Sequence, residues 1–153
     1  MFDRYPGTKL DSIPQELRGE FKDPDTKSKT KNTIIVAKNY WMESSKDTKY
    51  FLSDSMVLSS YNGAYFLSTL DDNKQYWHIL YVKPSGKDLE LFALFYDSKV
   101  PAEKNSITKY FTPKFDADSN AVFTMNEEKL LLYTQKELLN EESMKLKRIK
   151  LKR

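Results

Sequence analysis

The chain has no cysteine, and this absence removes several kinds of chemistry at once. Without a thiol there is no disulfide framework and no thiolate nucleophile, and a zinc site held by cysteine is excluded as well. The cellular compartment stays open on this observation, because proteins without cysteine occur in every compartment.

Glycine is also scarce, with four residues spread through 153 positions. Their spacing matches neither the G-x-G-x-x-G fingerprint of dinucleotide-binding folds nor the phosphate-binding P-loop. No apolar run approaches the roughly 18 residues that a membrane-spanning helix requires. The sequence therefore predicts neither a nucleotide enzyme of these kinds nor a helical membrane protein.

Histidine occurs once, as His78, and no G-x-S-x-G motif accompanies it. We expect His78 to be a buried, hydrogen-bonded strand residue on the same face as Leu80 and Val82, and not a catalytic group. The 22 carboxylates offer no pair that the sequence marks for glycoside hydrolysis. The sequence thus indicates no catalytic residue, no metal ligand and no cofactor.

Aromatic residues make up 14% of the chain and supply enough apolar surface for a packed core. At 153 residues one core is expected, so we predict a single β domain over residues 1–153. Its expected parts, in chain order, are an entry turn, first strand and polar loop in residues 8–30, a central meander, a helix at 126–139 and a terminal strand at 144–151.

The centre of the chain carries the pattern of an antiparallel meander. Asn62-Gly63 is its strongest hairpin signal, and residues 64–70 form the returning strand. Strands at 75–82 and 89–96 follow, separated by the turn Pro84-Ser85-Gly86. These strands should pair with their neighbours in sequence.

The strands at 76–82 and 89–96 are apolar on both faces, whereas a sheet with one wet face alternates cleanly. A capping box at Thr124 and Glu127 predicts the start of a helix. That helix can cover only one of the two faces. We therefore predict a mainly β fold in which about eight or nine strands of an antiparallel meander curl into a barrel or half-barrel, with the C-terminal helix packed outside. The candidate ligand-binding residues of the interior are the large apolar side chains Trp41, Phe66, Trp77, Ile79, Phe92 and Leu94.

An interior of about eight strands is either filled by side chains or able to hold one small ligand. We expect non-enzymatic binding of a small apolar or amphipathic ligand. A cell-envelope interaction module with a solid interior is the first alternative, and an enzyme of unrecognised type is the second. A cavity in the structure is the observation that separates the first two.

Positive charge is concentrated at the C-terminal end. Six of the 25 basic residues lie in the last nine positions, which leaves 19 basic against 22 acidic residues, a net charge of −3, for residues 1–144. Apolar Met144, Leu146, Ile149 and Leu151 alternate with these lysines and arginines, as in a half-buried strand. We therefore expect a structural strand and no nucleic-acid partner.

Three segments carry a resemblance to known proteins: Ile13 to Phe21, Leu52 to Leu58 and Tyr61 to Leu67. Their order and spacing resemble uncharacterised small lipocalin-like lipoproteins of Gram-negative bacteria, over most of residues 8–150. Gly19-Glu20-Phe21 is similar to the lipocalin entry motif G-x-W, with Phe21 where the motif has Trp.

The resemblance implies that the single β domain over residues 1–153 and its barrel or half-barrel are lipocalin-like, and it implies no catalytic residues. It does imply a leader and a lipid-bearing cysteine before Asp3, which would be the protein's link to a membrane. The expected location is then the cell envelope or periplasm, and the cytoplasm if no leader was removed.

Residues 116–127 carry most of the pattern of a calcium-binding EF-hand loop. Asp116, Asp118 and Asn120 stand at alternate positions and Glu127 at the twelfth. Ala121 occupies the sixth position, where the sharp turn of the loop requires glycine. A hairpin turn is the better interpretation of this segment.

We predict that calcium does not bind residues 116–127, because Ala121 disfavours the backbone conformation that brings the oxygen ligands together. Isothermal titration calorimetry with calcium should give only heats of dilution. A saturable isotherm at sub-millimolar affinity that disappears in Asp116→Ala would contradict this prediction.

Overall fold

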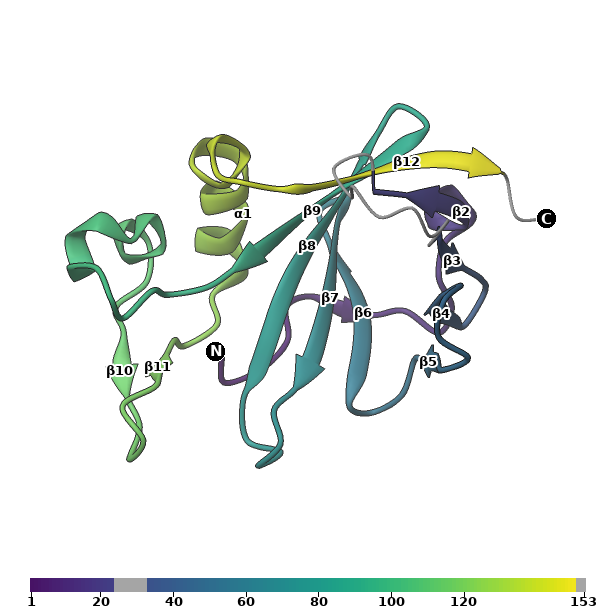
Figure 1. Cartoon of the computed structure of the whole chain (residues 1–153). Coiled ribbons are helices and arrows are strands. Elements are labelled where there is room, and N and C mark those ends of the chain that lie inside the picture. Colours follow the sequence, from purple (N-terminus) through teal and green to yellow (C-terminus); the bar gives the residue numbers. More distant parts are fainter. Residues whose placement is uncertain (24–32, 151–153) are drawn as a thin grey trace.

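The computed structural model describes residues 1–23 and 33–150 and shows a mainly β fold (Figure 1). Over this part of the chain, ten strands form one curled sheet and two form a small hairpin. The strands of the main sheet are β1 (Thr8–Lys9), β2 (Gly19–Lys22), β3 (Thr33–Val36), β4 (Tyr40–Glu43), β5 (Lys49–Phe51), β6 (Met56–Tyr61), β7 (Ala64–Leu70), β8 (Trp77–Ser85), β9 (Asp88–Leu94) and β12 (Met144–Lys150).

The predicted meander is confirmed: β6, β7, β8 and β9 pair in sequence order, and every pair is antiparallel. The β6–β7 hairpin turns at Asn62 and Gly63, whose φ angles are 47° and 81°. Two consecutive positive φ angles are what a tight two-residue hairpin needs, and Asn-Gly adopts them readily. Most of the polar loop predicted within residues 8–30 lies outside the described residues.

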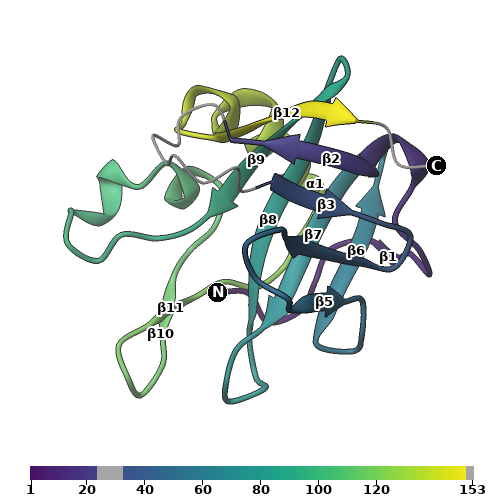
Figure 2. The same ribbon diagram turned by 45° about the vertical axis from the view of Figure 1, so that its right-hand side comes forward.

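The last strand, β12, joins two halves of the sheet. Its first residues pair with β9, with Leu146 opposite Leu89, and its later residues pair with β2, with Arg148 opposite Phe21. Strands β2 to β5 therefore continue the sheet and fold across one face of β6 to β9 (Figure 2). The sheet order begins at β1 and ends at β5, so the result is a half-barrel.

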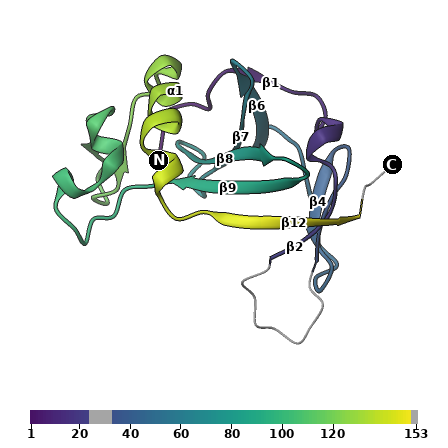
Figure 3. The same cartoon turned by 90° about the horizontal axis from the view of Figure 1, so that it is seen from above.

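The other face of β6 to β9 carries the helices (Figure 3). These are α1 (Glu127–Lys136) and the short 3₁₀ helices η2 (Ala102–Lys104), η3 (Ser106–Lys109) and η4 (Leu138–Asn140). Near them lies the hairpin of β10 (Lys114–Phe115) and β11 (Ala121–Val122). A further 3₁₀ helix, η1 (Gln15–Leu17), precedes β2. No helix within the described ranges has the length and apolar content needed to cross a membrane.

An outer core fills the space between the helices and the sheet. Aromatic rings dominate it, and the Phe2 ring lies 5.4 Å from those of both Phe111 and Phe123. We call outer core the buried residues Phe2, Ala64, Phe66, Ile79, Phe92, Leu94, Ile107, Phe111, Phe123, Met125, Leu130, Tyr133 and Leu138. The predicted helix packed outside the sheet is thus confirmed.

The helix begins two residues later than the predicted capping box. Asn126 is the N-cap, and its side chain accepts a hydrogen bond of 3.0 Å from the Lys129 N–H. Thr124 is exposed and Glu127 forms an ion pair with Arg4, so neither completes a capping box. Asparagine is as good an N-cap residue as serine or threonine. The apolar pattern alone therefore could not decide whether the helix starts after Thr124 or after Asn126.

Arg148 anchors β12 to the entry of the half-barrel. Its guanidinium donates to the Lys87 carbonyl at 2.6 Å and to the Glu16 carbonyl at 2.7 Å, and also to the Arg18 carbonyl. It lies 4.7 Å above the centre of the Phe21 ring, which is fully buried. One basic residue of the C-terminal segment is therefore structural.

The predicted alternation of the terminal strand is correct at Leu146, which is 2% exposed, and wrong at Ile149, which is 48% exposed. Strand alternation puts Arg148 on the same face as Leu146, and the register shifts between Arg148 and Lys150. Ile149 therefore points outward, and Leu151 lies outside the described residues.

We predict that Leu146→Ala lowers the free energy of unfolding by about 2–4 kcal/mol, because it removes a buried side chain at the junction of the two half-sheets. Ile149→Ala, the same kind of truncation on the exposed face of β12, should cost less than about 1 kcal/mol. Urea unfolding followed by circular dichroism measures both. Equal losses would show that β12 does not join the halves as described.

Candidate functional site

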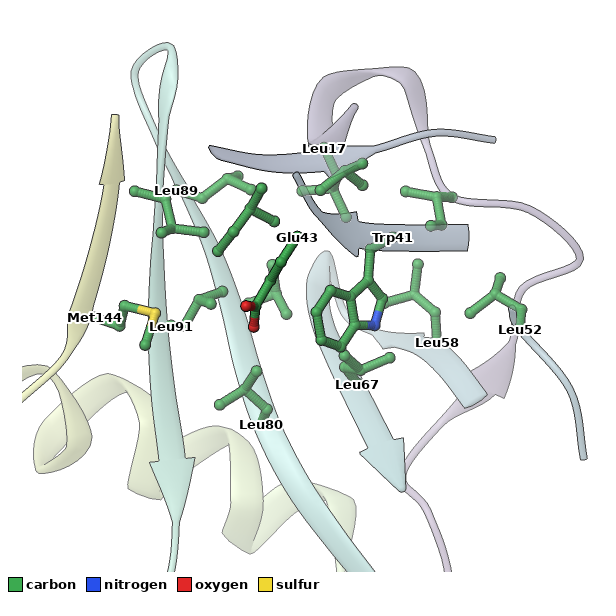
Figure 4. Close-up of a pocket in the computed structure, with 15 residues that line it drawn as sticks. Leu17, Trp41, Glu43, Leu52, Leu58, Leu67, Leu80, Leu89, Leu91 and Met144 are labelled. Atoms are coloured by element: carbon green, nitrogen blue, oxygen red, sulfur yellow. The ribbon is translucent and has the colours of Figure 1, made fainter. Parts of the chain in front are cut away.

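A cavity of about 270 Å³ lies between the two halves of the sheet (Figure 4). Fifteen residues of the described part of the chain line it, and fourteen of them are apolar. We call it the inner cavity, and its lining is Ile13, Leu17, Ile34, Val36, Trp41, Glu43, Leu52, Leu58, Leu67, Leu80, Val82, Leu89, Leu91, Met144 and Leu146. The lining comes from both halves and from the segment that leads into β2, so the cavity exists only when the sheet has curled.

Strand register explains why leucines gather there. Successive strand residues point to opposite faces, and residues paired across neighbouring strands share a face. Leu58, Leu67 and Leu80 are paired in a row across β6, β7 and β8. Val82 and Leu91 continue this face on β8 and β9. The residues between them belong to the opposite face.

Trp41 is the largest side chain in the lining. It stacks on Tyr50 of the neighbouring strand, with ring centroids 4.4 Å apart and an interplanar angle of 20°. Its indole Nε1 is buried and forms no hydrogen bond with any described residue. Such an unpaired donor costs free energy, so β4 packs here at some expense in stability.

Among the described residues of this lining, Glu43 is the one with a charged side chain. It lies two residues after Trp41 on β4, so both point to the same face, and its carboxylate is drawn among apolar side chains in Figure 4. An oxygen of Glu43 lies 3.4 Å from the Lys46 ammonium in the following turn. A carboxylate in an apolar lining gives the cavity a polar end.

A hydrogen bond between Tyr65 and Glu16 holds η1 against β7. The Tyr65 hydroxyl donates to the Glu16 carboxylate, and this bond, with burial and the nearby negative charge, raises the pKa of Tyr65 to about 12. The hydroxyl therefore stays protonated at neutral pH. Leu17 in the same short helix lines the inner cavity, so the bond helps to position one of its walls.

The predicted interior residues lie mostly on the other face. Trp41 lines the inner cavity as predicted. Four of the others are buried in the outer core, namely Phe66, Ile79, Phe92 and Leu94, and Trp77 packs against it. The sequence showed two apolar faces, but the period of two residues cannot say which face turns inward, and choosing the larger side chains selected the helix side.

The cavity-lining leucines alternate with the residues that were predicted. Leu67 follows Phe66, Leu80 follows Ile79 and Leu91 precedes Phe92. The sequence feature that could have identified these leucines is the contrast between a strand face of aromatic rings and a strand face of leucines. Rings interlock with rings from other segments, whereas leucines meeting across a curled sheet leave space.

Two further sequence motifs have structural roles. His78 is exposed, not buried as expected, because it lies one residue into β8, near the end of the strand. Asp116 accepts backbone hydrogen bonds from Asp118 at 2.9 Å and Asn120 at 2.8 Å, which closes the β10–β11 turn. No group of three or more His, Cys, Asp or Glu side chains suited to a metal occurs in residues 1–23 and 33–150.

A second hollow of about 550 Å³ lies near the β7–β8 turn, and its lining is about half polar and half apolar. Asp71 at its edge accepts hydrogen bonds from the backbone N–H groups of Gln75 and Tyr76, and these bonds lower the pKa of its carboxyl. The carboxylate is therefore engaged in shaping the turn. We take the inner cavity as the candidate functional site, because apolar enclosure is typical of small-molecule sites.

Comparison with known proteins identifies no relative of this chain. No protein-family model matches the chain, and neither the curated proteins nor the solved structures contain a significant match. The candidate site therefore depends on the geometry of this chain alone.

Proposed function

We propose that the protein binds a small apolar or amphipathic ligand in the inner cavity without catalysing a reaction. The observation that carries the proposal is a space of about 270 Å³ between the two halves of the sheet, lined by fourteen apolar residues of the described part of the chain. Protein interiors are packed as densely as organic crystals, and few voids exceed the size of one water molecule. An apolar void that persists is best explained by a ligand that fills it.

The size of the cavity suits a small ligand. Small-molecule sites commonly measure about 300–1,000 Å³, and an engineered apolar cavity of about 150 Å³ stays dry and binds benzene. The inner cavity lies between these values. Its lining favours an aliphatic chain or a small ring system, which would gain about 25 cal/mol for each Å² of apolar surface removed from water.

The alternatives receive less support. An interaction module with a solid interior needs side chains to fill the space that the cavity occupies. For an enzyme, acid–base catalysis calls for positioned titratable groups, and Glu43 is one carboxylate among apolar neighbours. A location in the cell envelope, and attachment to a membrane through a lipid anchor, stay predictions.

Binding can be followed through Trp41 in a Trp77→Phe background, because Trp77 packs against the outer core and would add an unresponsive signal. We predict that ten-carbon amphiphiles and an environment-sensitive apolar dye each give saturable changes in Trp41 emission and compete with one another. The reciprocal variant, Trp41→Phe, should keep Trp77 emission and lose the response. A flat response to every probe argues for the solid-interior module.

Filling the cavity gives an independent test. We predict that Leu80→Trp abolishes binding with little loss of stability, since the added ring occupies existing space. Leu132→Trp on the helix, where the side chain is 42% exposed, is the matched control and should bind as the unmodified protein does. Dye titration and thermal unfolding of both variants decide the matter. Binding that survives Leu80→Trp would place the ligand elsewhere.

A further inference from the structure

The inner cavity runs across the meander from β12 to β6. Met144 lies on β12 and Leu58 on β6, and β9, β8 and β7 lie between these strands in the sheet. Four strand spacings of about 4.8 Å make this path on the order of 19 Å along the curled sheet. Figure 4 shows the two side chains on opposite sides of the cavity. An elongated apolar space of this kind fits an extended alkyl chain better than a compact ring system.

One end of the cavity is open and the other is closed. At the open end, Met144 is 47% exposed. At the other end, Ile13 is 5% exposed and Leu58 is 4% exposed, although both line the cavity. A polar head group loses free energy when it is buried without a hydrogen-bond partner. The head group of an amphiphile therefore stays in water beside Met144, and the end of its chain meets Leu58.

Backbone hydrogen bonds hold the closed end in place. The Leu10 N–H donates to the Leu58 carbonyl at 2.9 Å, and the Ile13 N–H donates to the Lys38 carbonyl at 2.7 Å. Leu10 also packs against the apolar cluster that contains Ile13 and Leu58. A wall that is fixed in this way cannot move aside for a longer chain without disturbing the packing around it, and packed cores tolerate extra methylene groups poorly.

The volume of the cavity sets the number of carbon atoms that it holds. An engineered apolar cavity of about 150 Å³ binds benzene, which has six carbon atoms. In the same proportion, a space of about 270 Å³ holds about eleven carbon atoms. Carbon atoms beyond this number remain in water at the open end, where they bury no further apolar surface.

We propose that the inner cavity limits the chain length of its ligand: it binds single-chain amphiphiles with increasing affinity up to about eleven carbon atoms, and Leu58 at the closed end sets this limit. This inference rests on the proposed function, because it specifies the ligand class of the same site. Leu58 is then the residue that contacts the end of the chain and determines which lengths fit.

The test uses a homologous series of neutral alcohols: hexanol, octanol, decanol, dodecanol and tetradecanol. Competition against the apolar dye, in the Trp77→Phe background, measures each affinity below the solubility limit of the alcohol. Affinity should rise about fourfold for each methylene group that becomes buried. The rise should stop between decanol and dodecanol, and tetradecanol should bind no more tightly than dodecanol. Transfer of the same alcohols from water into an alkane is the reference, because its increment per methylene group continues through the whole series.

Two substitutions of Leu58 should move the limit in opposite directions. Leu58→Ala removes three carbon atoms from the closed end, so the rise in affinity should extend by about two to three carbon atoms. Leu58→Phe adds three carbon atoms there and should end the rise near octanol. Met144→Ala, a truncation of the lining at the open end, is the matched control and should not extend the rise, because the space that it adds is already open to water. If one Leu58 variant does not fold, the other decides together with the limit in the unmodified protein.

The outcomes separate the two proposals. An affinity that keeps rising to tetradecanol in the unmodified protein, or the same limit in both Leu58 variants, overturns the chain-length inference and leaves ligand binding intact. A limit that Met144→Ala extends as far as Leu58→Ala does overturns it as well. Binding of none of the alcohols, and of no dye, overturns both proposals.

Discussion

The rest of the structure depends on one constraint: the strands of the meander are apolar on both faces and need cover on both sides. Helix α1, together with η3 and η4, covers one face and completes the outer core. Strands β2 to β5 cover the other, and β12 ties them to β9. A flat sheet would leave one of these apolar faces in water, so the curl follows from the composition of β8 and β9.

The two covers differ in how well they fill space, and this difference locates the cavity. On the helix side, rings meet rings at many angles, as where Phe66, Tyr81 and Phe92 lie in a row with centroids 5.5 and 5.9 Å apart. On the other side, leucines of the meander face short strands that cross them. Short aliphatic side chains at a crossing cannot interlock everywhere, and the remaining space is the inner cavity.

The sequence allowed the meander, the outside helix and the terminal strand to be predicted, because each has a local signal. Asn62-Gly63 marks a turn by its backbone preference, and the interleaved apolar residues around Leu146 mark a strand. No local signal shows whether the face with Phe66 and Phe92 or the face with the leucines turns inward. This choice is decided by which segment docks on which face, and the insertion of β12 between β9 and β2 pairs residues more than 120 positions apart.

A half-barrel suits the proposed binding of a ligand, because it surrounds a cavity without closing the sheet. Full closure removes sheet edges, whereas here β1 and β5 end the sheet and are only two and three residues long. Short edges limit unwanted pairing with other chains. A backbone hydrogen bond of 2.7 Å from the Ile13 N–H to the Lys38 carbonyl joins the segment that leads into β2 to the β3–β4 turn. Ile13 lines the cavity and is 5% exposed, whereas Met144 of the same lining is 47% exposed, so the cavity opens beside Met144 without any strand pair having to break.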